Sequence, residues 1–300
     1  MDAPRSVLIA GCGYVGARLG TLLAARGDVV LGLRRNPDTL PDGITAVKAD
    51  LCAPETLVAI PTGVTDVVIT TAPGGGDDER YRQAYVRGPE NLLSFLRGRG
   101  DPVRRVLLTT STGVYAQTDG DWVDERSPTE PTHFSGQRML EGEAVIAAGE
   151  FESVAVRLAG IYGPGRTRLI DRVRSGEARA PRQSLWTNRI HRDDCAGLLE
   201  ALLDLDAPPT MVIGVDQEPA ELDDVQRFLA AELSVAVPPA QDPPEPPEPA
   251  KGSIEATAGR RTRSNKRCSN ALALALGYRF RFPTYREGYR AMLAAEAHRR

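Results

Sequence analysis

The chain has 300 residues, 41% of them hydrophobic, and a formal net charge of −3 from 37 basic and 40 acidic side chains. This size can bury the core of one large domain, or of a large domain with a smaller lobe. The lack of a basic excess argues against a nucleic-acid partner, and no uncharged apolar run is long enough to span a membrane.

Cysteine and histidine show no metal-ligand pattern. The residues concerned are Cys12, Cys52, Cys195, Cys268, His133, His191 and His298. The cysteines lie far apart, without C-x-x-C spacing, and the histidines do not cluster with them. We therefore expect no metal site and no disulfide framework, and thiols that stay reduced in a cytoplasmic protein.

The first apolar run, with strand character, is followed by Gly11, Gly13 and Gly16 and then by helical apolar spacing. A G-x-G-x-x-G turn between a strand and a helix is typical of dinucleotide-binding sites. Gly11 permits the tight turn, Gly13 lets a pyrophosphate approach the backbone, and Gly16 lets the helix pack on the strand. Tyr14 and Val15 lie within the same turn, and we predict that all five residues contact the cofactor.

The same segment resembles a lipoprotein signal, because Cys12 follows Ile-Ala-Gly after an arginine and an apolar run. The charge of Arg5 is offset by Asp2, and cleavage before the cysteine would destroy the glycine turn. We therefore favour the nucleotide-binding turn over a secretion signal.

Strand and helix patterns alternate through the first two thirds of the chain. Strands are predicted at 7–10, 29–33, 46–49, 66–71, 103–110, 153–158 and 210–215, and helices at 17–26, 54–60, 79–98, 136–149, 192–204 and 221–233. Continuous Val, Ile and Leu strands with helices between them indicate a parallel sheet covered on both faces. The predicted fold class is therefore α/β, a Rossmann-type doubly wound parallel sheet with a small C-terminal lobe.

We divide this single unit into a dinucleotide-binding core at 1–160 and a part at 161–300 that is mainly substrate lobe, with strands and helices that return to the core. Residues 238–249 contain seven prolines in twelve and are expected to be extended. This segment is a surface loop or, alternatively, a ligand for a proline-binding partner. Helical spacing resumes at 269–277 and 285–295.

The end of the second strand indicates which nicotinamide nucleotide is bound. Sites that prefer NAD carry an acid there for the ribose 2′-hydroxyl, whereas this strand ends in Arg34 and Arg35. Arginine makes charge-assisted, often bidentate bonds to phosphate, so NADP is the predicted cofactor, with NAD still possible. The alternative is that both arginines end a strand in solvent.

Two further strand ends are expected to border the cofactor. Asp50 and Leu51 follow the third strand, and the Asp50 carboxylate either accepts from the adenine amino group or caps the helix that follows. Thr71, Ala72 and Pro73 end the fourth strand at the carboxyl edge of the sheet, where ligands lie in such folds.

Five segments in order resemble the extended short-chain dehydrogenase/reductase family, also called the NAD-dependent epimerase/dehydratase family. They are GCGYVG at 11–16, YVRGPENLL at 85–93, TTSTGVYA at 109–116, RLAGIYGPGR at 157–166 and NRIHRDDCA at 188–196. The resemblance implies a Rossmann cofactor domain, a C-terminal substrate lobe, a catalytic Ser or Thr on the fifth strand and a Tyr-x-x-x-Lys pair on the next helix. It assigns the Ser/Thr role to Ser111. It also implies that the segment at 191–194 opens a helix, for which we expect Asp193 or Asp194 as N-cap.

The Tyr-x-x-x-Lys pair is missing from its expected place. One alignment frame puts Phe134 and Arg138 at the two positions, and another puts His133 and Gln137 there. In the family the tyrosine transfers a proton and the lysine lowers its pKa and holds the nicotinamide ribose. Arg138 could still hold ribose, although an arginine hardly deprotonates.

Three substitutes for the missing phenol remain open. His133 is an acid or base candidate because histidine titrates nearer neutrality than other side chains, and the alternative is a capping or surface histidine. Tyr115 carries a phenol on the loop after Ser111, at a position that is usually structural in the family. Ser111 with ordered water could also polarise a carbonyl.

These residues favour an NADP(H)-dependent oxidoreductase that moves a hydride to or from a carbonyl or alcohol of a small organic molecule. One alternative is a nucleotide-sugar epimerase or dehydratase. The other is a non-catalytic NADP-binding sensor or scaffold, which the missing pair favours. By analogy with the family, a homodimer through the helices at 79–98 and 136–149 is possible.

Overall fold

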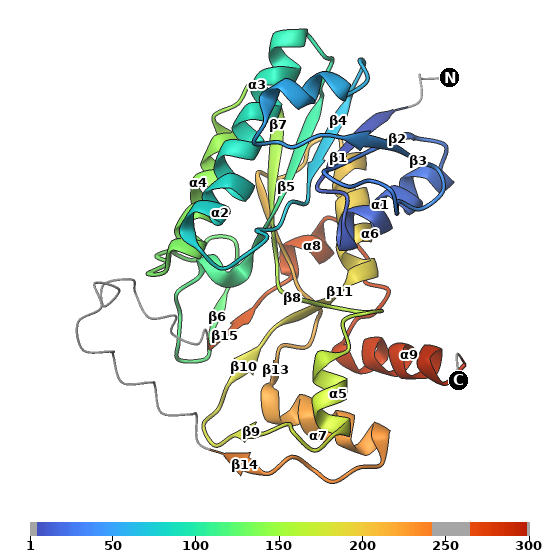
Figure 1. The fold of residues 1–300 in the computed structure, drawn as a ribbon. Helices are drawn as coiled ribbons and strands as arrows, with labels where there is room; N and C mark the ends of the chain where they lie inside the picture. Colours follow the sequence, from blue (N-terminus) through green and yellow to red (C-terminus); the bar gives the residue numbers. More distant parts are fainter. Residues whose placement is uncertain (1–4, 242–264, 299–300) are drawn as a thin grey trace, which may run out of the picture.

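The computed structural model describes residues 5–241 and 265–298, which form a seven-stranded sheet with helices on both faces and a smaller lobe below it (Figure 1). The strand order is β12-β7-β5-β4-β1-β2-β3, and every neighbouring pair is parallel. The strands are β1 (Ser6–Ala10), β2 (Val29–Arg34), β3 (Ile44–Lys48), β4 (Asp66–Ile69), β5 (Arg105–Ser111), β7 (Glu152–Leu158) and β12 (Met211–Gly214).

Helices cover the two faces of the sheet because side chains alternate along each strand. Ile9 of β1 shares a core with Leu19 of the first helix, whereas its neighbour Leu8 shares a second core with Leu92 and Leu96 on the other face. The covering helices are α1 (Tyr14–Ala25) and α6 (Arg192–Asp204) on one face, and α3 (Gly88–Arg99) and α4 (Phe134–Ala147) on the other, joined by the short segments η1 (Pro54–Ala59), α2 (Asp78–Arg82), η2 (Gln83–Arg87) and η3 (Thr112–Val114).

The predicted α/β class is confirmed, and all seven predicted strands lie in this sheet. The helix predicted at 79–98 differs, because it is divided into α2, a π-helical turn at η2, and α3. Pro89 has no backbone N–H to continue an α-helical ladder, and the N–H of Gly88 instead donates to the carbonyl of Gln83, five residues back.

The lobe is built on α5 (Arg168–Arg174), α7 (Leu222–Leu233) and α9 (Tyr285–Ala297), whose apolar side chains form a third core. Short strands pair around it: β8 (Gly160–Tyr162) with β11 (Arg189–His191), β9 (Ala180–Pro181) with β14 (Ala240–Gln241), β10 (Trp186–Thr187) with β13 (Ala220–Glu221), and β6 (Asp121–Val123) with β15 (Lys266–Cys268). The last helix before α9 is α8 (Ala271–Ala275), which lies against β12.

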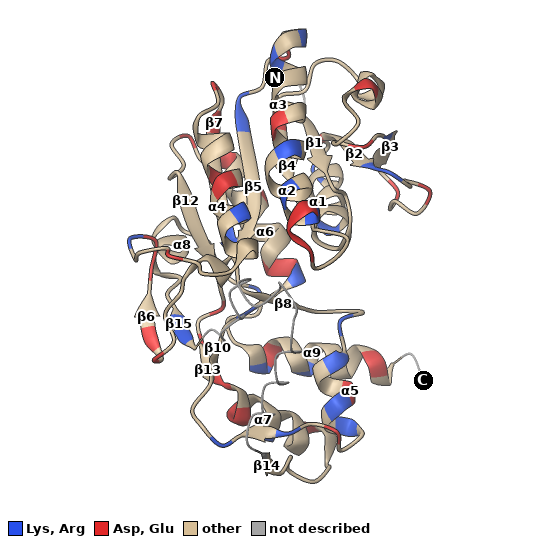
Figure 2. Cartoon of the chain, turned by 60° about the vertical axis from the view of Figure 1, so that its left-hand side comes forward, with Lys and Arg blue, Asp and Glu red and all other residues tan. Residues whose placement is uncertain are grey.

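The chain crosses between the sheet and the lobe repeatedly. It leaves the sheet after β7, returns with α6 and β12, leaves again to form α7, and returns at β15 and α8 before ending in α9 (Figure 1). Of the proline-rich segment, residues 242–249 lie outside the described residues. Charged residues are spread over both parts, and Lys and Arg are prominent on and around α5 (Figure 2).

Across residues 5–241 and 265–298, no helix combines the length and apolar character needed to cross a bilayer. All four cysteines are free thiols; Cys52 is exposed and the other three are buried.

Candidate active site

The glycine turn joins β1 to α1, with Gly13 as the N-cap of the helix. Gly11 has φ +79°, and a Cβ there would lie 2.7 Å from the backbone nitrogen of Thr71. A Cβ on Gly16 would lie 2.6 Å from Thr70 Oγ1 and 2.8 Å from Ile9 Cγ2. Packing within the protein therefore requires glycine at both positions, as the spacing of the motif predicts.

Gly13 differs, since the atom nearest to a Cβ built there is the carbonyl oxygen of Gly11 at 3.6 Å. The N–H groups of Tyr14, Val15 and Gly16 lie in the first turn of α1 and have no acceptor within the described residues. Free N–H groups beside an open backbone at a helix N-terminus suit the pyrophosphate of a dinucleotide.

Arg34, at the end of β2, is half-buried and Arg35 is exposed. Neither guanidinium forms a hydrogen bond or ion pair within residues 5–241 and 265–298. Most arginines of the sheet domain have such partners, for example Arg105 with Glu152 and Arg26 with Asp204. Both side chains are therefore available to a phosphate.

The two other strand ends lie at the same carboxyl edge of the sheet. Asp50 Oδ1 accepts from the backbone N–H of Cys52 at 2.9 Å, whereas the N-cap of η1 is Ala53. The helix-capping alternative for Asp50 is therefore wrong, because a local turn takes its carboxylate. Leu51 is buried, and Thr71 donates its hydroxyl to the carbonyl of Ala84 at 2.8 Å. Beyond Thr71, Ala72 is exposed and Pro73 is half-buried on the loop that leads to α2.

Ser111 is the last residue of β5 and is half-exposed. Its Oγ accepts from the backbone N–H of Gly113 at 3.1 Å, which places the hydroxyl over the short turn η3. A Cβ on Gly136 would lie 3.4 Å from the carbonyl oxygen of Gly113, so the start of α4 lies against this turn.

His133 is the N-cap of α4. Its Nδ1 accepts from the backbone N–H of Ser135 at 3.2 Å and lies 2.8 Å from Ser135 Oγ. With Nδ1 accepting, the tautomer assigned to the neutral ring carries its hydrogen on Nε2, which has no partner within the described residues. Sequence reasoning left open whether this histidine caps a helix or handles a proton, and the geometry is compatible with both.

Arg138 is held by two carboxylates. Its Nε and Nη2 donate to the two oxygens of Asp78 at 2.7 and 2.9 Å, and its Nη1 donates to Glu141 at 2.5 Å. The Arg138 guanidinium thereby joins α4 to α2, and a ribose hydroxyl would have to compete with these bonds for it. This arrangement gives Arg138 a structural task that the sequence pattern did not reveal.

Tyr115 lies in the core, with 1% of its surface exposed. Arg157 donates to its phenol oxygen at 2.8 Å, and burial raises the pKa of Tyr115 to about 12. Arg157 also forms a buried ion pair with Glu143, which in turn accepts from Thr110 at 2.7 Å. The position and the high pKa favour the structural role for Tyr115 over proton transfer.

Three kinds of comparison agree with this geometry. A family model described as NAD(P)H-binding matches residues 11–206. The solved structure of a "putative NAD-dependent epimerase/dehydratase" from Methylobacillus flagellatus is 36% identical to this chain. The match covers 98% of this chain and 100% of that chain, with a TM-score of 0.81. The chain belongs to the extended short-chain dehydrogenase/reductase family.

Two curated relatives extend this result. Protein YeeZ of Escherichia coli K12 is 30% identical over 216 residues, which are 66% of this chain and 73% of that protein. The dTDP-6-deoxy-L-talose 4-dehydrogenase (NAD(P)(+)) of Kitasatospora kifunensis is 30% identical over 234 residues, 70% of this chain and 73% of that protein. This member of the family therefore uses a nicotinamide nucleotide in a general dehydrogenase or epimerase role.

As a short-chain dehydrogenase/reductase, the chain departs from the family pattern at the Tyr-x-x-x-Lys pair. Its lysines are Lys48, Lys251 and Lys266, and none of them follows a tyrosine by four positions. The buried Lys266 donates to the carbonyl oxygen of Tyr115 at 2.9 Å, although the two residues are 151 positions apart in the sequence.

The segment at 191–194 opens α6, as the family resemblance implies, but the expected N-cap is wrong. The N-cap of α6 is His191, whose Nδ1 accepts from the N–H of Asp193 at 3.1 Å. Asp194 is fully buried and accepts from the backbone N–H groups of Arg281 and Phe282 at 2.6 and 3.0 Å. Asp193 and Asp194 therefore lie in the first turn of α6, and Asp194 joins this turn to the segment before α9.

Lowering the pH from 7 to 5 is expected to cost about 2 kcal/mol of the free energy of unfolding through His191 alone. Burial lowers the pKa of His191 to about 4, whereas a histidine in the unfolded chain takes up a proton below its ordinary pKa of 6.5. The unfolded state therefore binds more protons between these values, and the stability falls as the pH is lowered. Urea unfolding at both pH values measures this loss. His191→Asn, which keeps a capping acceptor, should lose less, and an equal loss in both proteins would contradict the assignment.

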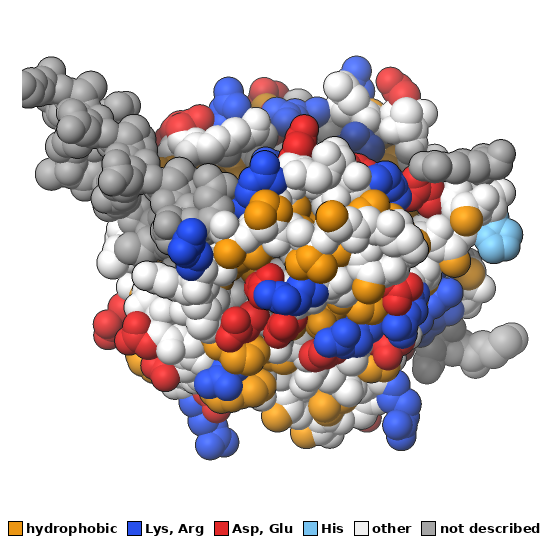
Figure 3. All heavy atoms as spheres, turned by 90° about the horizontal axis from the view of Figure 1, so that it is seen from below, with side chains coloured by type: hydrophobic (Ala, Val, Ile, Leu, Met, Phe, Trp, Pro, Cys, Tyr) orange, Lys and Arg blue, Asp and Glu red, His pale blue; other side chains and the backbone are white. Residues whose placement is uncertain are grey.

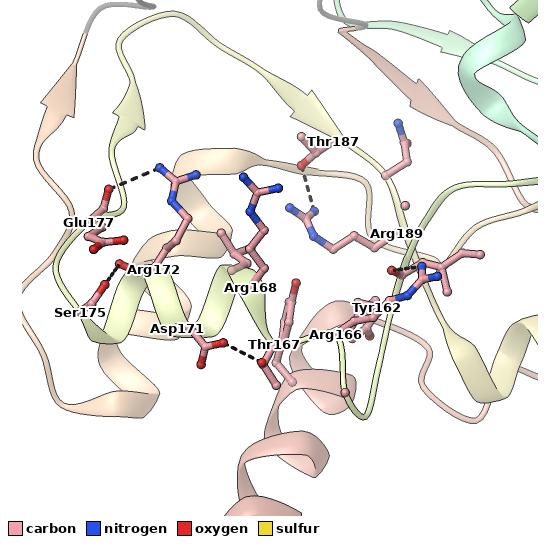
Figure 4. Close-up of a pocket in the computed structure, with 16 residues that line it drawn as sticks. Tyr162, Arg166, Thr167, Arg168, Asp171, Arg172, Ser175, Glu177, Thr187 and Arg189 are labelled. Carbon is pink, nitrogen blue, oxygen red and sulfur yellow. Dashed lines mark hydrogen bonds between the residues drawn. The ribbon is translucent and has the colours of Figure 1, made fainter. Parts of the chain in front are cut away.

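A cavity of about 1200 Å³ opens in the lobe beside α5 (Figure 4). Four arginines line it, and we call it the arginine cavity: Arg166, Arg168, Arg172 and Arg189. Arg166 also lies over the ring of Tyr14, 4.3 Å from its centroid, and Tyr14 donates to the carbonyl oxygen of Pro164 at 2.9 Å. The glycine turn and the cavity are therefore in contact. Arg166 and Arg189 lie in the segments at 157–166 and 188–196 that carry the family resemblance, whereas Arg168 and Arg172 lie in none of the five.

Proposed function

We propose that the protein is an NADP(H)-dependent oxidoreductase that acts on a carbonyl or alcohol of a small organic molecule. The observation that carries the proposal is the position of His133, which presents a free Nε2 at the start of the helix that packs on the Ser111 turn. A bound nicotinamide supplies or accepts the hydride.

The cofactor preference rests on Arg34, which ends β2, and on Arg35, which follows it. Neither has an ion pair within the described residues, and a 2′-phosphate lies at this strand end in NADP sites. The first turn of α1 would hold the pyrophosphate through its N–H groups, with Gly13 leaving room for it.

In the reduction of a carbonyl, Ser111 and His133 would each act on the substrate oxygen. The Ser111 hydroxyl would donate to the substrate oxygen and polarise the carbonyl, while protonated His133 would give that oxygen its Nε2 proton. The ring left behind carries its hydrogen on Nδ1, and Ser135 Oγ at 2.8 Å accepts it. In this form and in the protonated ring, Nδ1 carries a hydrogen and no longer accepts from the backbone N–H of Ser135, so the cap bond is exchanged for a bond to the Ser135 hydroxyl.

Arg34→Ala is expected to remove a preference for NADPH over NADH of about one to two decades, because a bond to a charged group contributes about 1.5–3 kcal/mol. Fluorescence titration of wild type and variant with both nucleotides measures the two affinities. Lys48→Ala, at the neighbouring end of β3, is the matched loss of one positive charge. Equal affinities for the two nucleotides in the wild type would defeat the proposed preference.

The oxidoreductase proposal is tested by stoichiometric consumption of NADPH with a panel of ketones, aldehydes and quinones. Turnover supports it. A tightly retained nucleotide that does not exchange supports an epimerase or dehydratase instead, and tight binding without turnover supports the non-catalytic sensor, which the missing Tyr-x-x-x-Lys pair favours.

A further inference from the structure

Both tryptophans of the chain lie on one small surface where three short strands meet. Trp122 is the middle residue of β6, Arg267 faces it from the paired strand β15, and Trp186 begins β10. β10 in turn contacts β15, and the three strands lie together where the sheet domain meets the lobe (Figure 1). We call these three side chains the tryptophan platform.

Arg267 lies over the rings of both tryptophans. Its Cζ is 5.2 Å from the ring centroid of Trp122 and 4.7 Å from that of Trp186, distances at which a guanidinium is attracted to an indole face. Its Nε donates to the carbonyl oxygen of Gly120 at 2.7 Å, and it forms no ion pair with the part of the chain that the structure describes. The platform therefore presents aromatic surface beside a positive charge that has no carboxylate partner there.

Hydrogen bonds between neighbouring loops hold the platform in place. Asn265 Oδ1 accepts from the backbone N–H of Trp186 at 2.8 Å, and its Nδ2 donates to the carbonyl oxygen of Ser184 at 3.1 Å. The N–H of Gly120 donates to the carbonyl oxygen of Asn265 at 2.9 Å. Gly120 has φ +81°, and a Cβ there would lie 3.0 Å from Trp186 Cδ1, so this turn requires glycine. A ligand would therefore meet a preformed surface, which lowers the cost of binding.

Trp122 is 57% exposed, which sets it apart from the rest of the surface. The other large hydrophobic side chains that are exposed among the described residues are aliphatic: Val29, Val58, Val237 and Leu274. Single exposed hydrophobic side chains are normal, and on the underside of the molecule they are interspersed with basic and acidic ones (Figure 3). An exposed tryptophan beside a stacked arginine is different, because these two residue types are enriched at binding hot spots.

The proline-rich segment of this chain has the chemistry that such a surface binds. Residues 243–249 lie outside the described residues, and their sequence is Pro-Pro-Glu-Pro-Pro-Glu-Pro. Proline-rich peptides bind to aromatic-lined surfaces, because their limited conformational freedom leaves little entropy to lose. Glu245 and Glu248 add carboxylates that can accept charge-assisted hydrogen bonds from Arg267.

The described residues on either side of this segment lie close to the platform. Gln241 of β14 pairs with Pro181 of β9, and Trp186 follows Pro181 by five residues, which is at most about 18 Å of extended chain. Seven residues in polyproline II conformation span about 19 Å, so residues 243–249 are long enough to reach the platform. The described chain resumes at Asn265, which itself supports the platform. A short tether supplies an effective concentration of about millimolar, so even a weak contact would be occupied.

We propose that the tryptophan platform binds residues 243–249 of the same chain, with prolines against the indole of Trp122 and a glutamate against Arg267. The proposal goes beyond the oxidoreductase activity and does not depend on it, because no residue of the platform belongs to the predicted cofactor-binding or catalytic residues.

Intrinsic fluorescence tests the proposal in the full chain, because both of its tryptophans lie in the platform. One variant replaces four prolines: Pro243→Ser, Pro244→Ser, Pro246→Ser and Pro247→Ser. Its emission should shift to longer wavelength and its quenching by acrylamide should increase, because water and quencher gain access to Trp122. Pro102→Ser, an exposed proline before β5, is the control and should change neither quantity. Circular dichroism checks that both variants are folded.

A second measurement titrates the four-proline variant with synthetic peptides by calorimetry. The peptide PPEPPEP should bind with a Kd of about millimolar or below and restore the wild-type fluorescence. The peptide PPQPPQP should bind about two- to fivefold more weakly, the contribution of an exposed ion pair. Adding Trp122→Ala should weaken binding of PPEPPEP by about 10-fold or more. Adding Val58→Ala, at an exposed aliphatic residue elsewhere, should leave it unchanged.

Three results would overturn the proposal. The first is equal quenching in the wild type and the four-proline variant, and the second is no binding of PPEPPEP at millimolar concentration or equal binding after Trp122→Ala. The third is protection of the wild-type tryptophans that grows with protein concentration, which would assign the platform to a second copy of the chain.

Discussion

Replacing His133 by asparagine is expected to lower kcat with a reducible carbonyl by about 10²- to 10⁴-fold, the usual contribution of a general acid. Asparagine keeps an acceptor for the backbone N–H of Ser135, so the start of α4 should keep its cap. Steady-state kinetics and urea unfolding of the same preparation measure both effects.

His133→Ala is the companion variant, because it removes both the cap and the proton donor. It should lose the same activity and about 1 kcal/mol of stability in addition. If His133→Asn turned over at the wild-type rate, the histidine would be a capping residue and the proton would have another source.

The second large effect is expected at the buried ion pair beneath the Ser111 turn. Arg157→Met should lower the free energy of unfolding by about 3–5 kcal/mol, because it leaves the Glu143 carboxylate buried without its partner. The ion pair is 2.6 Å long, and the two side chains are 7% and 12% exposed. Urea unfolding followed by circular dichroism measures the change.

The control for this prediction is the double variant Arg157→Met with Glu143→Leu. Removing both charges should recover much of the lost stability, because an apolar pair has no charge left to desolvate. A single variant within 1 kcal/mol of wild type, or a double variant less stable than the single one, would contradict this account.

The sheet could be predicted from the sequence because each strand carries its own signal. Continuous apolar runs such as the one at 67–69 are buried on both faces, a pattern that is typical of strands in parallel sheets. The glycine turn could be predicted from its spacing between one strand and one helix. The contacts that require Gly11 and Gly16, however, come largely from Thr70 and Thr71, just after β4 and far along the chain.

The parts that could not be predicted depend on partners distant in the sequence. Nothing near Arg138 reveals that Asp78 lies sixty residues away on the facing helix, or that Arg189 and Arg172 share a cavity. The cap of α6 was misassigned because histidine is an uncommon N-cap, whereas the two acids after it are common ones.

The repeated passage of the chain between sheet and lobe limits how the two parts can swing. A lobe attached by one linker can pivot freely, whereas strands and helices that cross in both directions act as several hinges in parallel. All of these connections must bend together when the lobe moves away from the sheet, so a wide separation of the two parts costs free energy. We therefore expect the entrance for small molecules to be largely preformed, with selectivity arising from its fixed shape and charge.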